Sequence, residues 1–290
     1  MLARFPPWLK KTLTYSEQSD RTKNILTDFG LQTVCERARC PNIGECFSKG
    51  RATFLILGGI CTRDCKFCAI RSGKPFPLDQ DEPKRVAQAA EGLELQHVVV
   101  TSVTRDDLPD YGANQFAKTV IALRERLKLS TIEVLVPDFG AEDGLIEIVI
   151  EAGPDIFNHN LDTVPRLYKE IRPKANYWRS LRSLELAKKE NDKIYTKSGL
   201  MVGMGEHEFE VYHVMEDLRR VDCDCLTVGQ YLRPSSQNFP IYQFIHPDQF
   251  KAYEAKAYEM GFKNVSSGPF VRSSYQAEKN FSKVSPAMGR

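Results

Sequence analysis

Three cysteines stand together in one short segment, Cys61-Thr62-Arg63-Asp64-Cys65-Lys66-Phe67-Cys68. Their thiolates can converge on one point, and thiolates bind zinc and iron–sulfur clusters alike. A structural zinc ion takes four protein ligands, and no fourth ligand lies nearby, since the closest histidine is His97. Three ligands to a four-iron cluster leave one iron open. The segment therefore favours such a cluster over zinc or a loop without metal.

A second group of three cysteines, Cys35, Cys40 and Cys46, precedes the first, so six of the eight cysteines fall between residues 35 and 68. Eight cysteines are too few for a disulfide scaffold in a chain of 290 residues, and their clustering indicates metal binding. A second cluster accounts for this density better than three buried structural cysteines do. Cys223 and Cys225 lie at a predicted strand start, far in sequence from both groups of three, and we interpret them as structural.

From residue 53 onward, apolar β-branched runs alternate with segments of helical period. Such alternation predicts an α/β fold with βαβ units and a parallel sheet. Six units favour an incomplete (β/α)6 TIM-like barrel, and an open doubly wound sheet is the alternative. The predicted strands are Thr53–Leu57, His97–Val103, Ile132–Val136, Asp155–Asn158, Lys197–Val202 and Cys225–Tyr231.

Outside the repeats, residues 1–52 form an N-terminal extension that carries the second cysteine group and is helical around Asp20–Phe29. Residues 53–262 form the partial barrel. Residues 263–290 are rich in Ser, Gly and Pro and are expected to be a tail over the surface. Active sites of such folds lie at the carboxyl ends of the strands, where this chain places its conspicuous polar and glycine-rich segments. These segments are 58–61, 101–107, 158–160 and 203–206.

Charge and hydropathy exclude two classes of partner. Lys and Arg number 40 against 38 Asp and Glu and are mixed along the chain, so nothing predicts nucleic-acid binding. The longest apolar runs are far below the roughly 18 residues of a membrane-spanning helix. Because residues 1–13 lack the apolar core of a secretory signal, we expect a cytoplasmic protein that does not bind membranes.

The triad at residues 61–68, with an aromatic residue before its last cysteine, matches the signature of the radical S-adenosylmethionine superfamily. Over nearly the whole chain, the sequence resembles the lipoyl synthases of that superfamily. Besides both triads, the resemblance is carried by these motifs: Pro6-Pro7-Trp8-Leu9, Thr101-Ser102-Val103, Arg105-Asp106-Asp107-Leu108, Phe157-Asn158-His159-Asn160, Ile171-Arg172-Pro173, Gly229-Gln230-Tyr231-Leu232 and Gly268-Pro269-Phe270-Val271-Arg272-Ser273-Ser274-Tyr275.

The resemblance implies two 4Fe-4S clusters. Cys61, Cys65 and Cys68 would hold the catalytic cluster that cleaves S-adenosylmethionine to methionine and a 5′-deoxyadenosyl radical. Three further cysteines, Cys35, Cys40 and Cys46, with Ser274 as fourth ligand, would hold an auxiliary cluster. That cluster would donate two sulfur atoms to C6 and C8 of a protein-bound octanoyl-lysine, consuming two S-adenosylmethionine molecules. A serine oxygen is harder than a thiolate, so its iron is expected to be displaced more easily.

The expected contacts to S-adenosylmethionine are Phe67, Thr101, Ser102, Asn158, Val202 and Leu232. The polar side chains among them could instead cap the loops that follow their strands. The implied partners are octanoylated lipoyl-carrier domains, namely 2-oxoacid dehydrogenase E2 and glycine cleavage H protein, and an electron donor such as flavodoxin or ferredoxin. The alternatives are a two-cluster methylthiotransferase and a zinc-stabilised binding module without catalysis.

Two positions depart from the family pattern. Tyr111 stands where the family usually has glycine, and Arg233 stands where glutamine is common. A glycine adopts a positive φ readily whereas a tyrosine does so at a cost, so the turn geometry around Tyr111 is open at this point.

Overall fold

The computed structural model describes residues 5–12 and 14–282, and its main sheet has eight strands in the order β1-β2-β5-β6-β7-β8-β9-β10. All neighbours pair in parallel except β1 and β2, which are antiparallel. The six predicted strands are confirmed, each to within two residues at either end. They are β2 (Thr53–Ile56), β5 (His97–Ser102), β6 (Thr131–Leu135), β7 (Ile156–Asn158), β8 (Tyr195–Val202) and β9 (Cys225–Gln230).

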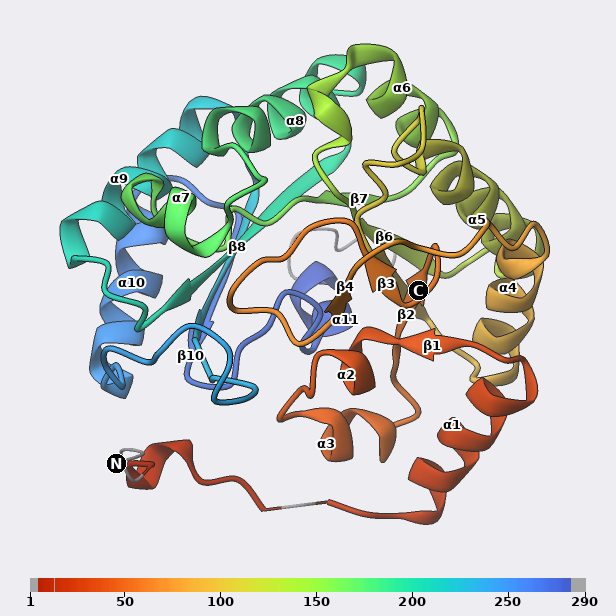
Figure 1. The fold of residues 1–290 in the computed structure, drawn as a ribbon, viewed down its shortest axis with the longest axis horizontal. Coiled ribbons are helices and arrows are strands. Elements are labelled where there is room, and N and C mark those ends of the chain that lie inside the picture. Colours follow the sequence, from red (N-terminus) through yellow and green to blue (C-terminus); the bar gives the residue numbers. More distant parts are fainter. Residues whose placement is uncertain (1–4, 13, 283–290) are drawn as a thin grey trace.

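The sheet curls but does not close, because β1 (Gln32–Thr33) and β10 (Asn264–Gly268) are its two edges. Figure 1 shows the helices along the outside of this arc and loops over its centre. The expectation of a partial barrel is therefore confirmed.

The expectation that residues 263–290 form a tail over the surface is wrong for β10. Asn264–Gly268 pairs in parallel with β9 along its whole length, and Val265 is fully buried. The serines and glycine of this strand resemble a loop in composition, but pairing with a neighbouring strand outweighs β-propensity. Beyond it, α11 (Ala277–Ser282) packs against β10 and β5, and residues 283–290 lie outside the described residues.

The N-terminal extension consists mainly of helices, two of which begin at a side-chain cap. Helix α1 (Glu17–Asp28) confirms the predicted helix and begins where the Ser16 side chain accepts the Ser19 amide. After β1, Thr33 caps α2 (Val34–Arg37) by accepting the Glu36 amide, and α3 (Ile43–Phe47) follows. Figure 1 shows α2 and α3 between the two edges of the sheet. The second cysteine group thereby reaches the open side of the barrel.

Apolar stripes attach the outer helices to the sheet. Phe116, Val120 and Leu123 form a fully buried stripe on α5 (Ala113–Arg126), and Val214, Met215 and Leu218 form another on α9 (Glu208–Arg220). The other outer helices are α4 (Glu82–Gly92), α6 (Asp143–Glu151), α7 (Tyr168–Ile171), α8 (Tyr177–Glu190) and α10 (Pro247–Glu259). Among the described residues, no helix combines the length and hydropathy that crossing a membrane requires.

A polar group ties the strands together inside the barrel. The fully buried Glu133 of β6 accepts hydrogen bonds from Lys197 of β8 at 2.8 and 3.0 Å and from the Asn158 amide of β7 at 2.7 Å. His97 of β5 lies 3.5 Å from the same carboxylate. Burial by itself raises the pKa of Glu133, but Lys197 and His97 outweigh it and hold that pKa at about 2.

Candidate active site

The first cysteine triad lies on a loop bracketed by two short strands, β3 (Ile60–Cys61) and β4 (Arg71–Ser72). Arg63 fastens this loop to the barrel, because its buried guanidinium binds Asp106 at 2.7 Å and Asp138 at 2.8 Å. Burial raises the pKa of Asp138, and Arg63 more than reverses that effect, so the carboxylate stays ionised. The loop is therefore held by ion pairs as well as by its strands.

The three cysteines of this loop line one cavity of about 200 Å³, which we call the first-triad cavity. Phe67, Thr101 and Ser102, which are expected from the sequence to contact S-adenosylmethionine, line it too. Within residues 5–12 and 14–282, no three His, Cys, Asp or Glu side chains are grouped around a point that suits a single metal ion. The three thiols that border this cavity are of the ligand type that a four-iron cluster takes.

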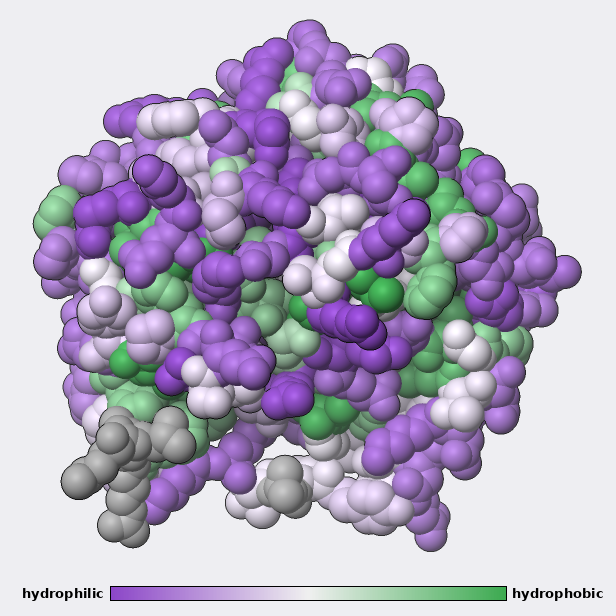
Figure 2. Space-filling model, in the orientation of Figure 1, coloured by the Kyte–Doolittle hydropathy of each residue, from purple (hydrophilic) through white to green (hydrophobic). Residues whose placement is uncertain are grey.

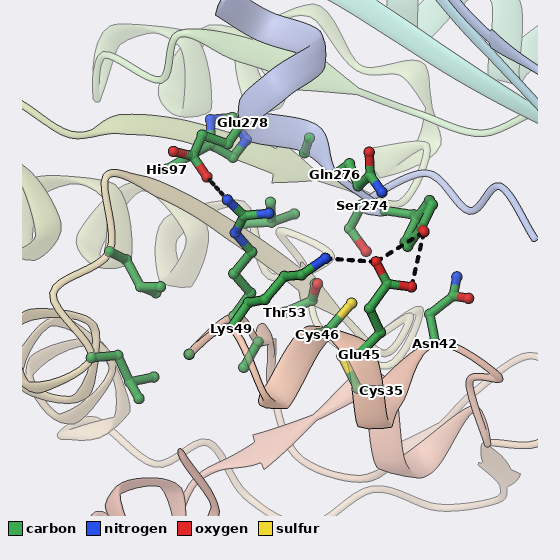
Figure 3. Close-up of a pocket in the computed structure, with 18 of the residues that line it drawn as sticks. Cys35, Asn42, Glu45, Cys46, Lys49, Thr53, His97, Ser274, Gln276 and Glu278 are labelled. Atoms are coloured by element: carbon green, nitrogen blue, oxygen red, sulfur yellow. Dashed lines mark hydrogen bonds and ion pairs between the residues drawn. The ribbon is translucent and has the colours of Figure 1, made fainter. Parts of the chain in front are cut away.

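The second cysteine triad lines another cavity, of about 230 Å³, which we call the second-triad cavity (Figure 3). Ser274 lies on its wall with Cys35, Cys40 and Cys46. The four predicted ligands of the auxiliary cluster thus meet at one place, although the serine follows the last of the cysteines by more than 200 residues. Three thiols and one hydroxyl match the donor set that the resemblance implies.

Contacts between the two chain ends place Ser274 there. The Tyr275 hydroxyl donates to both oxygens of Glu45 at 3.0 and 3.2 Å, and Glu45 adjoins Cys46 in sequence. The Asn42 amide donates to the Phe270 carbonyl at 2.7 Å. Helix α3 and its N-terminal flank therefore hold the C-terminal segment on both sides of the serine.

Two glycines let the C-terminal segment lie directly on the sheet. A Cβ atom on Gly199 of β8 would stand 2.8 Å from the Ser273 hydroxyl, and one on Gly229 of β9 would collide with the backbone of Val271. Ser273 also donates to the Asn160 side chain at 2.9 Å. The C-terminal segment is thereby fixed to the inner face of the barrel.

A third space, of about 380 Å³, joins the two triads, and we call it the central cavity. Cys35 and Cys40 from the second triad and Cys68 from the first all line it. Apolar side chains make up much of its remaining wall, including the predicted Leu232 together with Val34, Leu200, Met201 and Tyr231. Figure 2 shows small apolar patches among hydrophilic side chains on this face of the molecule.

Two predicted contacts to S-adenosylmethionine lie elsewhere in the structure. Asn158 is fully buried and its amide binds Glu133, and Val202 is buried in the core. Neither lines the two triad cavities or the central cavity. In their place, Asn160, two residues beyond Asn158, lines both the first-triad and the central cavity.

Asp162 and Arg172, which the sequence did not single out as site residues, line the first-triad cavity too. Arg172 donates to the carbonyls of Asn160 and Leu161 at 3.1 and 2.9 Å and lies 3.4 Å from Asp162. Burial raises the pKa of Asp162 to about 6 although Arg172 opposes the shift. Arg172 belongs to the Ile171-Arg172-Pro173 motif, a signal that could have found it, whereas no pattern in the sequence distinguishes Asp162.

The two departures from the family pattern have local explanations. Tyr111 does take a left-handed conformation, with φ +50°, directly before Gly112 at +91°. Its ring packs over Gly140, where an added Cβ would lie 3.3 Å from it. Arg233 donates to the carbonyls of Ser236 and Asn238, so it holds its own loop at the edge of the central cavity.

The remaining two cysteines take no part in either triad. Cys223 and Cys225 are buried, and the Cys223 thiol donates to the Cys225 carbonyl at 3.4 Å. Burial raises the pKa of Cys225 to about 12 and that of Cys223 as well, so both remain neutral thiols.

Comparisons with known proteins agree with this geometry. The model of the radical SAM superfamily matches residues 55–218. The lipoyl synthase of Caldanaerobacter subterraneus subsp. tengcongensis is 55% identical over 97% of this chain and 99% of its own length. The lipoyl synthase of Chromobacterium violaceum is 51% identical over 94% of this chain and 87% of its own.

Solved structures share the fold at lower identity. A maturase of the [FeFe]-hydrogenase superposes with a TM-score of 0.60 at 13% identity, covering 92% of this chain and 67% of its own. Methylornithine synthase superposes with a TM-score of 0.53 at 18% identity, covering 79% of this chain and 68% of its own. The sequence identities, together with the two thiol-lined cavities, show that this chain belongs to the lipoyl synthase family of the radical SAM superfamily.

Proposed function

We propose that this chain is a sulfurtransferase that inserts two sulfur atoms, at C6 and C8, into an octanoyl chain amide-linked to a lysine of a carrier protein. The observation that carries the proposal is the central cavity, which both cysteine triads line. A carbon radical formed there would lie beside the second triad without leaving the protein. Membership of the lipoyl synthase family supports the same reaction.

The proposed roles of the residues follow from the cavities that they line. Cys61, Cys65 and Cys68 would hold the cluster whose open iron binds S-adenosylmethionine, and one-electron cleavage there supplies the 5′-deoxyadenosyl radical. Thr101 and Ser102 would orient the bound S-adenosylmethionine, since they line the same cavity. The buried Arg63 ion pairs would keep the loop that carries these cysteines in place.

In this proposal, the second-triad cavity holds an auxiliary 4Fe-4S cluster that provides the sulfur. Cys35, Cys40, Cys46 and Ser274 would be its ligands, because these four residues line that cavity. A hydroxyl ligand leaves its iron easier to displace than a thiolate does, which suits a cluster that gives up sulfur.

The apolar wall of the central cavity fits a saturated acyl chain, and its opening would admit a lysine arm from outside. The proposed protein partners are therefore octanoylated carrier domains of 2-oxoacid dehydrogenases and of the glycine cleavage system. A flavodoxin or ferredoxin would supply the electrons.

The test is a reaction of the anaerobically reconstituted, reduced protein with S-adenosylmethionine and an octanoyl-lysyl peptide. We expect 5′-deoxyadenosine and a peptide that has gained two sulfur atoms, both detected by mass spectrometry. Formation of 5′-deoxyadenosine without any sulfur in the peptide would remove the proposed function and leave radical generation intact.

A further inference from the structure

One lysine of the N-terminal segment contacts both sides of the second-triad cavity. The Lys11 ammonium donates to the Asn42 side chain at 2.6 Å and pairs with Glu45 at 2.7 Å. The same ammonium lies 5.3 Å from the ring centroid of Phe270 and 5.2 Å from that of Tyr275. Lys11 therefore touches α3 and its flank on one side and the C-terminal segment on the other.

Lys11 is carried on a segment that crosses the open side of the barrel. We call residues 5–12 the strap, which Figure 1 shows running from the α10 side toward α1. Trp8 anchors it by an edge contact to His246, with 4.9 Å between ring centroids, and Leu9 is buried. The strap thus holds Lys11 at the place where α3 and the C-terminal segment meet.

We propose that Lys11 is a positioning residue for Ser274. Phe270 and Tyr275 flank the serine in sequence, and Glu45 adjoins Cys46, so the ammonium connects the neighbours of both predicted ligands. Lys11 itself lines none of the three cavities, so its action on the site passes through these neighbours. This inference rests on the proposed auxiliary cluster.

The chemistry of the contacts requires a cation at this point. An ammonium has three donors and no acceptor, so it can serve the Asn42 oxygen and the Glu45 carboxylate together. Its charge is also attracted to the faces of aromatic rings, which a neutral side chain of equal length is not. Arginine keeps both properties, whereas methionine keeps only the length. Lys49 also pairs with Glu45, at 2.8 Å, but Phe270 and Tyr275 have their ring contacts with Lys11.

The experiment compares Lys11→Met with Lys11→Arg as the conservative rescue and with Lys10→Met, at the exposed neighbouring lysine of the strap, as the matched control. Each protein is reconstituted anaerobically, and the release of iron to a chelator is followed through the absorbance of the clusters. Reductive cleavage of S-adenosylmethionine by dithionite reports the first-triad site separately. Hydrogen exchange of the amides of residues 271–276, measured on the same proteins without iron, reports how the C-terminal segment is held.

In Lys11→Met, we expect iron release from one of the two clusters and amide exchange at residues 271–276 to rise about 10-fold or more, as two lost cation–ring contacts and an ion pair require. S-adenosylmethionine cleavage by Lys11→Met should stay near its starting value, and so should all three measurements in Lys11→Arg and Lys10→Met. Unchanged iron release and exchange in Lys11→Met would overturn the inference, and so would an equal loss from both clusters. If the proposed function is wrong, the result differs, because the protein without substitutions would then hold only one cluster.

Discussion

Replacing Gly229 by alanine should impair the second-triad site and leave the first-triad site intact. The added Cβ would lie 3.1 Å from the Val271 carbonyl carbon and from a guanidinium nitrogen of Arg272, and closer still to the Val271 oxygen. Carbon atoms pack at about 3.5–4.0 Å, so the C-terminal segment must retreat by at least roughly 0.5 Å. Because Val271 obstructs the added Cβ with its backbone atoms, no rotamer change relieves that contact.

Overpacking of this kind costs about 1–3 kcal/mol, and here the cost falls on the segment that carries Ser274. We expect Gly229→Ala to bind about four irons instead of about eight, the content of one four-iron cluster instead of two. It should still cleave S-adenosylmethionine when reduced. Iron analysis, 5′-deoxyadenosine assays and urea unfolding measure the three effects.

Two other glycines provide controls. Gly144, near the start of α6, has nothing within 4 Å of an added Cβ, so Gly144→Ala should leave the iron content unchanged and gain up to ~1 kcal/mol of stability. In Gly199→Ala the added Cβ meets only side-chain oxygens, at 2.7–2.8 Å. Its iron content and stability should therefore lie between those of Gly229→Ala and Gly144→Ala. If Gly229→Ala keeps about eight irons and inserts sulfur normally, the close approach of the C-terminal segment is not what positions the serine.

Two further predictions concern the ligand and the barrel interior. Ser274→Ala should lose sulfur insertion while keeping S-adenosylmethionine cleavage. The control Ser273→Ala removes only the hydrogen bond to Asn160 and should keep both activities within a few-fold. Equal sulfur insertion by the two variants would contradict the ligand assignment. Glu133→Gln leaves the buried Lys197 without its counter-charge and should cost about 3–5 kcal/mol at neutral pH. Because the pKa of Glu133 is about 2 when folded against an ordinary 4.5, its contribution is complete above pH 4.5 and is lost as the pH falls toward 2. The stability difference between the two proteins, from urea unfolding, should therefore narrow in that window, and a constant difference would show that Glu133 is not ionised in the fold. The exposed variant Glu216→Gln should change little at any pH.

The parallel barrel was predictable because its strands are short apolar runs separated by amphipathic helices. A parallel strand that is buried on both faces, such as Val98–Val100, is a continuous apolar run and can be recognised in the sequence. β10 was missed for the opposite reason, since Ser266, Ser267 and Gly268 have the composition of a loop and become a strand only beside β9.

The cysteine positions of the site could be predicted from spacing alone, but their assembly could not. A serine in a segment rich in serine is usually a solvated hydroxyl, so Ser274 was identified only through the family motif. Lys11 and Asp162 have no local signal, because their roles arise from contacts between segments distant in sequence. Asn158 was predicted at the site from its place at a strand end, yet its amide is used by Glu133 inside the barrel.

The central claim is that the second site supplies sulfur to a radical generated from the first, across the cavity that both line. The most direct measurement uses protein whose clusters were assembled from ³⁴S-labelled sulfide, with free sulfide removed before the reaction. After a single turnover with S-adenosylmethionine and octanoyl-lysyl peptide, mass spectrometry counts the label in the product. We predict that both inserted sulfur atoms are ³⁴S. A product that carries two unlabelled sulfur atoms, with the labelled clusters still intact, would contradict the account.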